Sequence, residues 1–462
     1  MRSLKVNFAL NSANQLLSII VPLITTPYIS RVLGAEKLGM FSYANSVTYY
    51  FMMFAMLGLA NYGGREIAKI RSDKTKLSFC FSGIYYAQLI SSSMVIIIYM
   101  IYMIVINDAM SKIYFINVLS VLLDINWLYF GLEKFEITLK RNFYVKLMST
   151  ISIFLFIKKP DDVYLYALIV VLSSLLGNLL LWLNRLGEIF FVVVPRDIVL
   201  KHLRSNLTLF LPILLTSVYR VMDKIMLKWM TNYSQVGFYE NADKLGQVPL
   251  FLISSLSQIM IPRISFLLSN NKKDDTSIYL YKSITLISLL STTVIFGIMS
   301  VTNEFVPLYF GEGYDSCKGL ALVILPSYIF TGYASTIRSQ ILIPYGRDKE
   351  FGISLAIGAV CNTVLNLVMI PILSALGAAI ATAATEIVVC VVTVFFAKSE
   401  ISIRYILKNN IKYYVFGAIM FGVLTVFSYP FSGILLLVLK VFLGILVYGI
   451  CLVVDYSLIR KK

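Results

Sequence analysis

Charged residues are scarce in this sequence. Asp, Glu, Lys and Arg make up 14% of the 462 residues, and hydrophobic residues make up 58%. A soluble globular domain carries about a quarter charged residues, so the composition excludes a soluble protein and indicates a membrane protein. The alternation that a transmembrane barrel strand needs is missing from apolar stretches such as 94–106 and 413–427. The sequence therefore predicts an all-α polytopic membrane protein.

Groups that support catalysis or metal binding are also few. His202 is the one histidine, so neither a histidine-based metal site nor a catalytic triad is expected. The cysteines fall mostly in apolar stretches, which implies no disulfide framework. The predicted external connections are short, the longest being about 302–319, and no glycine-rich Walker loop is present. We therefore expect no enzymatic activity, no catalytic residues, no metal and no cofactor.

About fourteen apolar segments approach the ~20 residues needed to cross ~30 Å of hydrocarbon. The predicted spans are 9–33, 40–62, 79–105, 113–132, 143–157, 163–183, 206–230, 238–261, 278–301, 320–343, 351–373, 376–397, 414–429 and 433–454. They group into an N-terminal six-helix lobe (1–184), a cytoplasmic amphipathic linker (185–204), a C-terminal six-helix lobe (205–398) and an additional C-terminal helix pair (399–462). The first segment continues past Pro22 without a cleavage site, so no signal peptide is expected.

Lysine and arginine gather in every second connection. They are frequent at 65–76, 134–141, 185–204 and 398–412 and at both termini, and rare in the opposite connections. The positive-inside rule places the basic connections and both termini in the cytoplasm. This topology, with anionic lipid headgroups, accounts for most of the formal charge of +16, so a nucleic-acid partner is not expected. Within the linker, 190–194 is apolar and Arg196 follows, which suits a helix lying in the membrane interface; an ordinary amphipathic connector is the favoured alternative.

The two halves of the sequence look duplicated. A shift of 198 positions superposes 38–44 on 236–242 and brings Arg65 onto Arg263 at the end of the second span of each half. An even number of spans per half makes the repeats parallel, with the binding site at their interface near mid-membrane. Chance similarity among apolar helices explains a shared glycine easily and a matched arginine less well.

Ionisable residues lie at membrane depth in the seventh predicted span. Arg220, Lys224 and Lys228 recur every four residues and share one helical face, and Asp223 lies one turn from Arg220 as a neutralising partner. Each such charge costs roughly 2.5–3.5 kcal/mol at the bilayer centre, so the face is expected to line a hydrated cavity that attracts an anion. The alternative is that Arg220 and Asp223 pair only to lock the helix, while Lys228 reaches the interface.

Further polar residues are candidates for the same cavity. Asn11, Asn14, Gln15 and Ser18 give the first span a polar face, which either lines a cavity or bonds to another helix. Asp124 and Glu386, inside the fourth and twelfth spans, and Asp223 are candidates for ion coupling, with structural hydrogen bonding as the alternative. Arg338 and Arg31 are candidate phosphate ligands, because a guanidinium donates two parallel hydrogen bonds; both alternatively reach a membrane surface.

Several motifs resemble the Wzx-type polysaccharide repeat-unit (O-antigen) flippases, in the superfamily that contains the MATE exporters and the lipid II flippase. They read TPYISRVLGAEKLGMFSYA at 26–44, GLANYGGREI at 58–67, and MDKIML at 222–227 followed by VGFYENADK at 236–244. The resemblance covers essentially the full chain. It implies a MATE-like protein of the bacterial inner membrane that moves undecaprenyl-diphosphate-linked oligosaccharides across the bilayer, contacts membrane lipids, works beside a polymerase and a chain-length regulator, and acts as a monomer.

The sequence departs from the lipid II flippase in one respect. The arginines which that flippase carries in the inner part of its first two spans are not visible here before Arg31. We therefore expect Arg220, Lys224 and Arg338 to bind the diphosphate of the lipid carrier, in an alternating-access mechanism. A MATE-like exporter of cationic drugs is the nearest alternative, but it would need an acidic cavity, whereas the deep charges read as basic. A membrane glycosyltransferase or polymerase, or a structural scaffold, fits less well.

Overall fold

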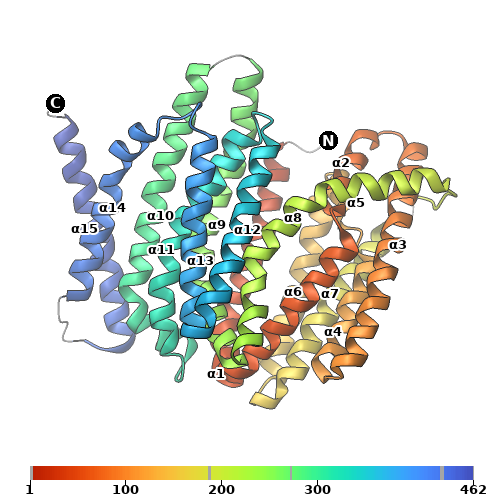
Figure 1. Cartoon of the computed structure of the whole chain (residues 1–462), viewed down its shortest axis with the longest axis horizontal. Helices are drawn as coiled ribbons and strands as arrows, with labels where there is room; N and C mark the ends of the chain where they lie inside the picture. The colour runs from red at the N-terminus through yellow and green to blue at the C-terminus, as the bar shows by residue number, and fades with distance from the viewer. Residues whose placement is uncertain (1–3, 186–188, 271–272, 427–430, 461–462) are drawn as a thin grey trace. The chain divides into compact units, whose positions relative to one another are not determined.

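The chain folds into helices joined by short connections in this computed structural model, which describes residues 4–185, 189–270, 273–426 and 431–460 (Figure 1). Those ranges contain no β-strand. The elements are α1 (Leu4–Met56), α2 (Leu59–Ile70), α3 (Lys74–Ile106), α4 (Ala109–Ser120), η1 (Val121–Leu123), α5 (Asn126–Gly131), α6 (Phe135–Phe156), η2 (Pro160–Asp162), α7 (Val163–Arg185), α8 (Arg196–Met230), α9 (Tyr233–Ser269), α10 (Lys273–Phe310), α11 (Ser316–Ile337), η3 (Arg338–Leu342), α12 (Asp348–Leu373), α13 (Ala375–Phe396), α14 (Ile403–Val426) and α15 (Gly433–Arg460). The predicted all-α fold is confirmed.

Eleven stretches within the described ranges are long and apolar enough to cross a membrane. Many of their large apolar side chains are exposed, for example Ile104 on α3 and Ile372 on α12, which suits helices that face lipid. The protein is therefore a multi-pass membrane protein. The number of fourteen spans remains a prediction, as do the predicted domain limits. By backbone contacts the chain divides into two compact units, Met1–Ser217 and Val218–Lys462, with the boundary inside α8.

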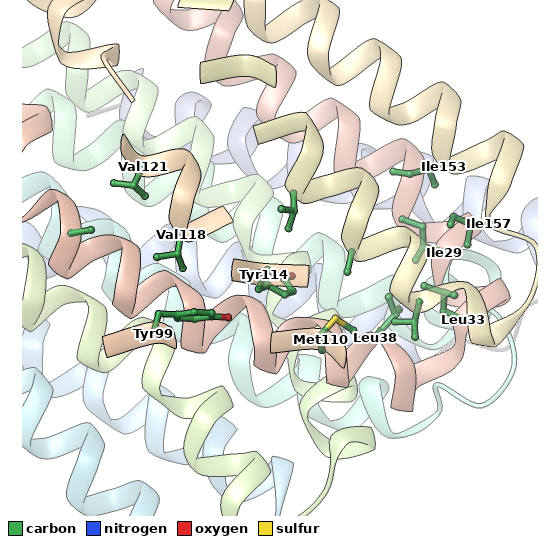
Figure 2. Packing of buried hydrophobic residues seen from close by; sticks show 14 of the residues in the cluster. Ile29, Leu33, Leu38, Tyr99, Met110, Tyr114, Val118, Val121, Ile153 and Ile157 are labelled. Atoms are coloured by element: carbon green, nitrogen blue, oxygen red, sulfur yellow. The ribbon is translucent and has the colours of Figure 1, made fainter. Parts of the chain in front are cut away.

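The first unit is built on a bend near the start of the chain. Gly34 breaks the long helix α1 by adopting φ 74° and ψ 170°, a conformation that glycine reaches without steric cost. The two parts correspond to the first two predicted spans. In this unit, apolar side chains of α1, α3, α4, α6 and α7 form one core, which includes Leu33, Tyr114 and Ile157 (Figure 2). Burial of these side chains holds the unit's helices together.

The fourth predicted span is interrupted in the structure. Helix α4 ends at Ser120, a 3₁₀ turn follows, and α5 begins at Asn126. Carbonyl groups freed by the interruption accept hydrogen bonds from other helices: Gln88 Nε2 donates to the carbonyl of Val121 at 2.8 Å, and Trp182 Nε1 donates to that of Leu123 at 2.8 Å. Such partners are required because water is not available inside a membrane to satisfy free carbonyls.

The connection between α7 and α8 is partly extended. The segment 189–195 is not helical, so the interfacial helix predicted for the linker does not form there. Its backbone is held by serines of α3: the amide of Phe190 donates to Ser78 Oγ at 3.2 Å, and that of Val192 donates to Ser82 Oγ at 3.0 Å. The ring of Phe191 stacks on Trp182. These contacts replace the hydrogen bonds that a helix would have supplied.

The second unit contains a distorted helix and a sharp turn. Helix α11 ends at Ile337, and the chain continues directly into η3, a π-helical segment over Arg338–Leu342. Distortions of this type occur frequently at functional sites. Helices α12 and α13 are joined through Ser374, which adopts φ 51°. The close approach of the two helices there requires Gly377, because a Cβ at this position would lie 2.1 Å from the carbonyl oxygen of Met369.

The C-terminal helix pair is fixed to α10 by polar contacts. Lys440 on α15 is buried, and its Nζ forms an ion pair with Oε1 of the half-buried Glu304 on α10 at 2.7 Å. The hydroxyl groups of Thr292 and Tyr448 lie 3.0 Å apart between the same two helices. Lys412 on α14 pairs with Asp455 on α15 at 2.5 Å. Helices α10, α14 and α15 lie side by side in Figure 1, and these contacts hold them in register.

Candidate functional site

A polar cavity of about 200 Å³ opens inside the second unit. Side chains of α8, α9, α11 and α13 line it, and many of them are ionisable or carry hydroxyl groups. The lining residues are Tyr219, Arg220, Asp223, Lys224, Tyr239, Asp243, Gln247, Leu250, Ser327, Tyr328, Thr331, Thr382 and Glu386. A chamber of this polarity within membrane-spanning helices is a functional-site candidate, because ionisable groups at membrane depth are costly to keep.

The end of α8 supplies three ionisable residues to the cavity. Arg220, Asp223 and Lys224 are three and four residues apart and therefore lie on one face of the helix. Their surroundings differ: Asp223 is 1% exposed, Lys224 is half-buried and Arg220 is exposed. The helical spacing predicted from the sequence thus brings these residues together. Lys228, the last member of the ladder, lies instead over the ring of Tyr233, 4.6 Å from its centroid.

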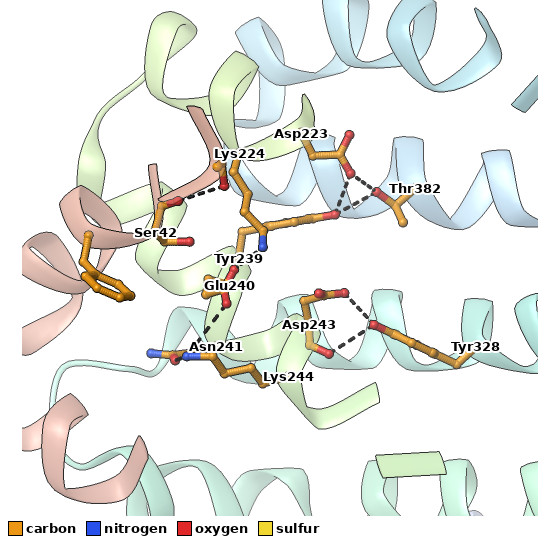
Figure 3. A network of polar contacts seen from close by, with 12 residues as sticks. Ser42, Asp223, Lys224, Tyr239, Glu240, Asn241, Asp243, Lys244, Tyr328 and Thr382 are labelled. Carbon is orange, nitrogen blue, oxygen red and sulfur yellow. Dashed lines mark hydrogen bonds and ion pairs between the residues drawn. The ribbon is translucent and has the colours of Figure 1, made fainter. Parts of the chain in front are cut away.

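Asp223 is held by three hydrogen-bond donors. Tyr239 Oη donates to Oδ2 at 2.7 Å and Thr382 Oγ1 donates to Oδ2 at 2.8 Å (Figure 3). Asn366 Nδ2 donates to Oδ1 at 2.6 Å. The predicted pairing of Asp223 with Arg220 is wrong, because no ion pair within 4.0 Å joins them. Three donors from α9, α12 and α13 satisfy the carboxylate instead, so α8 is tied to three other helices.

Lys224 is neutralised by a residue of α9. Its ammonium forms an ion pair with Glu240 Oε2, and Lys244 Nζ lies 3.8 Å from Glu240 Oε1 (Figure 3). Two lysines therefore share one carboxylate. Lys224 keeps its place in the cavity wall, but part of its charge is already used, which leaves less of it for a bound anion than the sequence suggested.

Asp243 and Tyr328 join α9 to α11. Tyr328 Oη donates to Asp243 Oδ1 at 2.6 Å and also lies 3.2 Å from the backbone carbonyl of Asp243. The ring of Tyr328 passes over Gly246, where a Cβ would lie 1.9 Å from the ring. Only glycine leaves room for the phenol to reach Asp243.

Arg220, Glu386 and Arg338 form a separate group of charges. Arg220 has no ion-pair partner within 4.0 Å in the described part of the chain, although Glu386 and Asp243 lie near enough to attract it. Glu386 is 5% exposed, and its Oε2 has no hydrogen-bond partner among the described residues. Arg338 is 7% exposed and lies over the ring of Phe351, 5.9 Å from its centroid. The structure thus places Arg338 inside the unit, not at a membrane surface.

The formal charges around the cavity balance. The cations are Arg220, Lys224, Lys244 and Arg338. The carboxylates are Asp223, Glu240, Asp243 and Glu386. The interpretation of the deep charges as basic is therefore wrong, because it counted the cations of α8 and overlooked the carboxylates of α9. Glu240, Asp243 and Lys244 repeat the spacing of Arg220, Asp223 and Lys224. This repetition inside a second apolar span could have identified the carboxylates of α9 from the sequence.

The remaining candidates lie in the first unit. Asp124 Oδ1 accepts hydrogen bonds from the backbone and side-chain nitrogens of Asn126 at 2.9 and 2.6 Å, and Arg141 Nη2 donates to Asn126 Oδ1 at 2.8 Å. Asp124 thus stabilises the start of α5. Ser18 Oγ accepts a hydrogen bond from Lys146 Nζ at 2.7 Å; Lys146, a cation within an apolar span, was missed.

Four other predicted residues are not part of the cavity wall as described. Arg31 is exposed and lies near the bend of α1. The structure does not describe the side chains of Asn11, Asn14 and Gln15. The predicted polar face of the first span is therefore represented only by Ser18, and it stays a prediction.

Comparison with known proteins gives matches over most of the chain. Residues 4–268 match the model of a family described as "Polysaccharide biosynthesis protein". A protein of Escherichia coli K12 named "Putative O-antigen transporter" is 22% identical over 389 residues, which is 82% of this chain and 93% of that protein. A "Probable low-salt glycan biosynthesis flippase" of Haloferax volcanii is 24% identical over 50% of this chain and 49% of its own length.

Solved structures with the same fold are transporters. A structure of the lipid II flippase MurJ in an inward closed conformation has a TM-score of 0.79 at 13% identity, and the match covers 97% of this chain and 98% of that one. An inward-facing multidrug resistance MATE family transporter has a TM-score of 0.64 at 13% identity, with 88% and 96% covered. The predicted MATE-like fold class is confirmed.

Proposed function

Because the chain belongs to the polysaccharide biosynthesis protein family, we propose that it is a flippase for lipid-linked oligosaccharides. The substrate is a repeat unit, of O-antigen or a similar surface polysaccharide, linked to undecaprenyl diphosphate. It moves from the cytoplasmic to the external leaflet. The names of the relatives and the fold shared with the lipid II flippase support this function, and they agree with the Wzx-type resemblance of the motifs.

The position of Arg220 is the observation on which the proposal mainly rests. Arg220 carries an exposed guanidinium at membrane depth, it lines a polar cavity, and in the described ranges no carboxylate lies within 4.0 Å of it. A guanidinium in this position suits a phosphate, because its fork of N–H groups donates two parallel hydrogen bonds to phosphate oxygens. We assign Arg220 as the main ligand of the carrier diphosphate. Lys224 and Arg338 support it, and Arg31 remains a further candidate.

Transport is proposed to occur by alternating access, without an enzymatic step. The relatives of known structure include MATE family transporters in inward-facing and outward-facing conformations, which supports a fold that can open to either side. The diphosphate would occupy the polar cavity, and the polyprenyl chain would stay in lipid. A conformational cycle of the protein would then expose the cavity to each side in turn.

Ion coupling is assigned to the carboxylates of the cavity. Asp223 is one candidate, because it lines the cavity and its three partners are uncharged. Glu386 also lines the cavity. Asp124 is the weakest candidate, because its carboxylate is engaged at the start of α5. Consumption of the product by a polymerase is the other driving force that fits the proposal.

The proposed setting is the bacterial cytoplasmic membrane, with both termini on the cytoplasmic side and the chain acting as a monomer. Basic residues lie near the ends of several helices, such as Lys69 in the last turn of α2, Arg71 directly after it and Arg347 before α12, which supports this orientation. A polysaccharide polymerase and a chain-length regulator are the expected partners, because they use the translocated unit.

One observation favours a second candidate function. Asp223, Asp243 and Glu386 line the cavity beside its two cations, and an exporter of organic cations would use such carboxylates. A strain that lacks its own multidrug exporters distinguishes the two functions. Expression of this chain should leave its resistance to ethidium unchanged if the protein is a polysaccharide flippase, and should raise it if the protein exports cations.

The proposed function is tested by restoring surface polysaccharide to a strain deleted for this gene. The double variant Arg220→Ala with Lys224→Ala should fail to restore it at a normal protein level, because the diphosphate loses its ligands. The matched control is Arg404→Ala with Lys408→Ala, which removes two exposed cations from α14. Full restoration by the cavity variant would remove both residues from the substrate site.

A further inference from the structure

Glu386 occupies an unusual position among the ionisable groups of the second unit. It is 5% exposed, it lines the cavity beside Arg220, and its Oε2 has no hydrogen-bond partner in the described part of the structure. A buried carboxylate oxygen without a partner is costly and is rarely kept for stability alone. Asp223, in the same cavity, shows the contrast, since three donors satisfy it.

Charged groups of three elements face Glu386. Arg220 on α8 and Arg338 in η3 attract the carboxylate, and Asp243 on α9 repels it. The titratable groups nearby are Tyr328 on α11 and Cys390, one turn further along α13. Helix α12 also packs against α13, but none of its described residues contributes a charge at this position.

The two arginines are attracted by Glu386 but are not bonded to it. Neither guanidinium lies within 4.0 Å of its carboxylate, and Nη1 of Arg338 has no hydrogen-bond partner among the described residues. A guanidinium normally uses its N–H groups when it is buried. Arg220 and Arg338 therefore retain donors for another anion, while Glu386 supplies the negative charge that holds them in place.

We propose that Glu386 is a built-in counter-anion for Arg220 and Arg338, and that a bound diphosphate displaces it by causing it to take up a proton. The inference rests on the proposed function, because it takes the carrier diphosphate as the ligand. The charges of the cavity residues already balance. A pyrophosphate diester adds one negative charge on each phosphate, so the site becomes strongly negative unless one carboxylate is protonated.

Glu386 is the carboxylate that is expected to take up this proton. The other three carboxylates keep partners of their own. Asp223 accepts hydrogen bonds from three donors, Glu240 lies beside two lysines, and Asp243 accepts a hydrogen bond from the Tyr328 hydroxyl. Apart from the Thr331 hydroxyl, Glu386 is stabilised by the same two arginines that the phosphate would bind. When the phosphate binds them, the attraction that favours the ionised form of Glu386 is replaced by repulsion, which favours protonation. Binding and proton uptake are then linked, and each favours the other.

Calorimetry on the purified full-length protein tests this inference. The probe is neryl-diphosphate-linked N-acetylglucosamine, a soluble pyrophosphate diester whose own charge is constant between pH 6 and 8. Titrations in buffers of different ionisation enthalpy count the protons taken up with the ligand. We expect about one proton per ligand and an affinity that rises up to about tenfold for each unit by which the pH falls. Glu386→Gln should bind the probe more tightly than the wild-type protein at pH 8, without proton uptake.

The controls separate the inference from the proposed function on which it rests. Glu312→Gln removes an exposed carboxylate from the connection between α10 and α11 and should bind like the wild-type protein. Loss of binding in Arg220→Ala, together with proton uptake that disappears in Glu386→Gln, supports both statements. Binding that needs Arg220 but takes up no proton, or the same proton uptake in Glu386→Gln, overturns the inference alone. No binding of the probe by the folded wild-type protein, or binding that Arg220→Ala leaves unchanged, overturns the diphosphate site itself.

Discussion

The hydrogen bond between Tyr239 and Asp223 gives a quantitative test of the charge state of the cavity. The phenol donates to the carboxylate at 2.7 Å, and both side chains are buried. A hydrogen bond to a charged group contributes about 1.5–3 kcal/mol, whereas neutral hydrogen bonds between membrane helices average about 0.6 kcal/mol. The three donors around Asp223 favour its ionised form and its burial opposes that form. The charge balance of the cavity requires the ionised form, for which the first range applies.

A double-mutant cycle measures this energy. The four proteins are the wild type, Tyr239→Phe, Asp223→Ala and the double variant, and the measured quantity is the free energy of unfolding in bicelles at pH 7. All four are made in a Thr382→Val background, because the hydroxyl groups of Tyr239 and Thr382 lie 2.9 Å apart and one could donate to the other once Asp223 is removed. The coupling energy therefore reports the bond to the carboxylate. We expect at least about 1.5 kcal/mol.

The same unit supplies a neutral control pair. Thr292 and Tyr448 are also buried and their hydroxyl groups lie 3.0 Å apart. The cycle with Thr292→Val and Tyr448→Phe should give a coupling energy of about 0.6 kcal/mol. If the Asp223 cycle gives no more than this control, Asp223 is not an ionised acceptor and the charge balance of the cavity is refuted.

Three further predictions follow from single contacts. Lys440→Ala should lower the free energy of unfolding by about 1.5–3 kcal/mol, because it leaves the half-buried Glu304 without its cation, and adding Glu304→Gln should recover most of this loss; equal loss in both variants would contradict the ion pair. Gly246→Ala should lower the thermal stability clearly, because its Cβ would meet the ring of Tyr328, and adding Tyr328→Ala should reverse part of the loss; a stable single variant would refute the close packing. Single cysteines at Ser72 and Ser316 should be labelled from opposite sides of the membrane, and labelling from one side would refute the orientation.

The fold was predictable from the sequence because it depends on local composition. Apolar stretches define the spans, and the break at Gly34 falls between the first two predicted spans, 9–33 and 40–62. The interruption near Asp124 was not predictable in this way. No proline or glycine lies at 121–126, and the freed carbonyls depend on partners such as Gln88 and Trp182, which are distant in the sequence.

The candidate site was predictable only in part. Helical spacing alone places Arg220, Asp223 and Lys224 on one face. The partners of Asp223 come from α9, α12 and α13, and spacing within α8 contains no information about them. Glu240 could have been found as a partner of Lys224, because an acidic residue inside an apolar span requires a cation. The burial of Arg338 depends on the π-helix of η3, which the sequence does not reveal.

Translocation by the purified protein tests the central claim most directly. Proteoliposomes that contain the wild-type chain and a fluorescent undecaprenyl-diphosphate-linked oligosaccharide are assayed for movement of the lipid between leaflets, beside Arg220→Ala and the exposed control Arg404→Ala. Loss of the bonds between Arg220 and the phosphate should slow translocation about ten- to a hundredfold, and Arg404→Ala should match the wild type. Equal rates in all three proteins would contradict the assignment of Arg220 as the ligand of the carrier diphosphate.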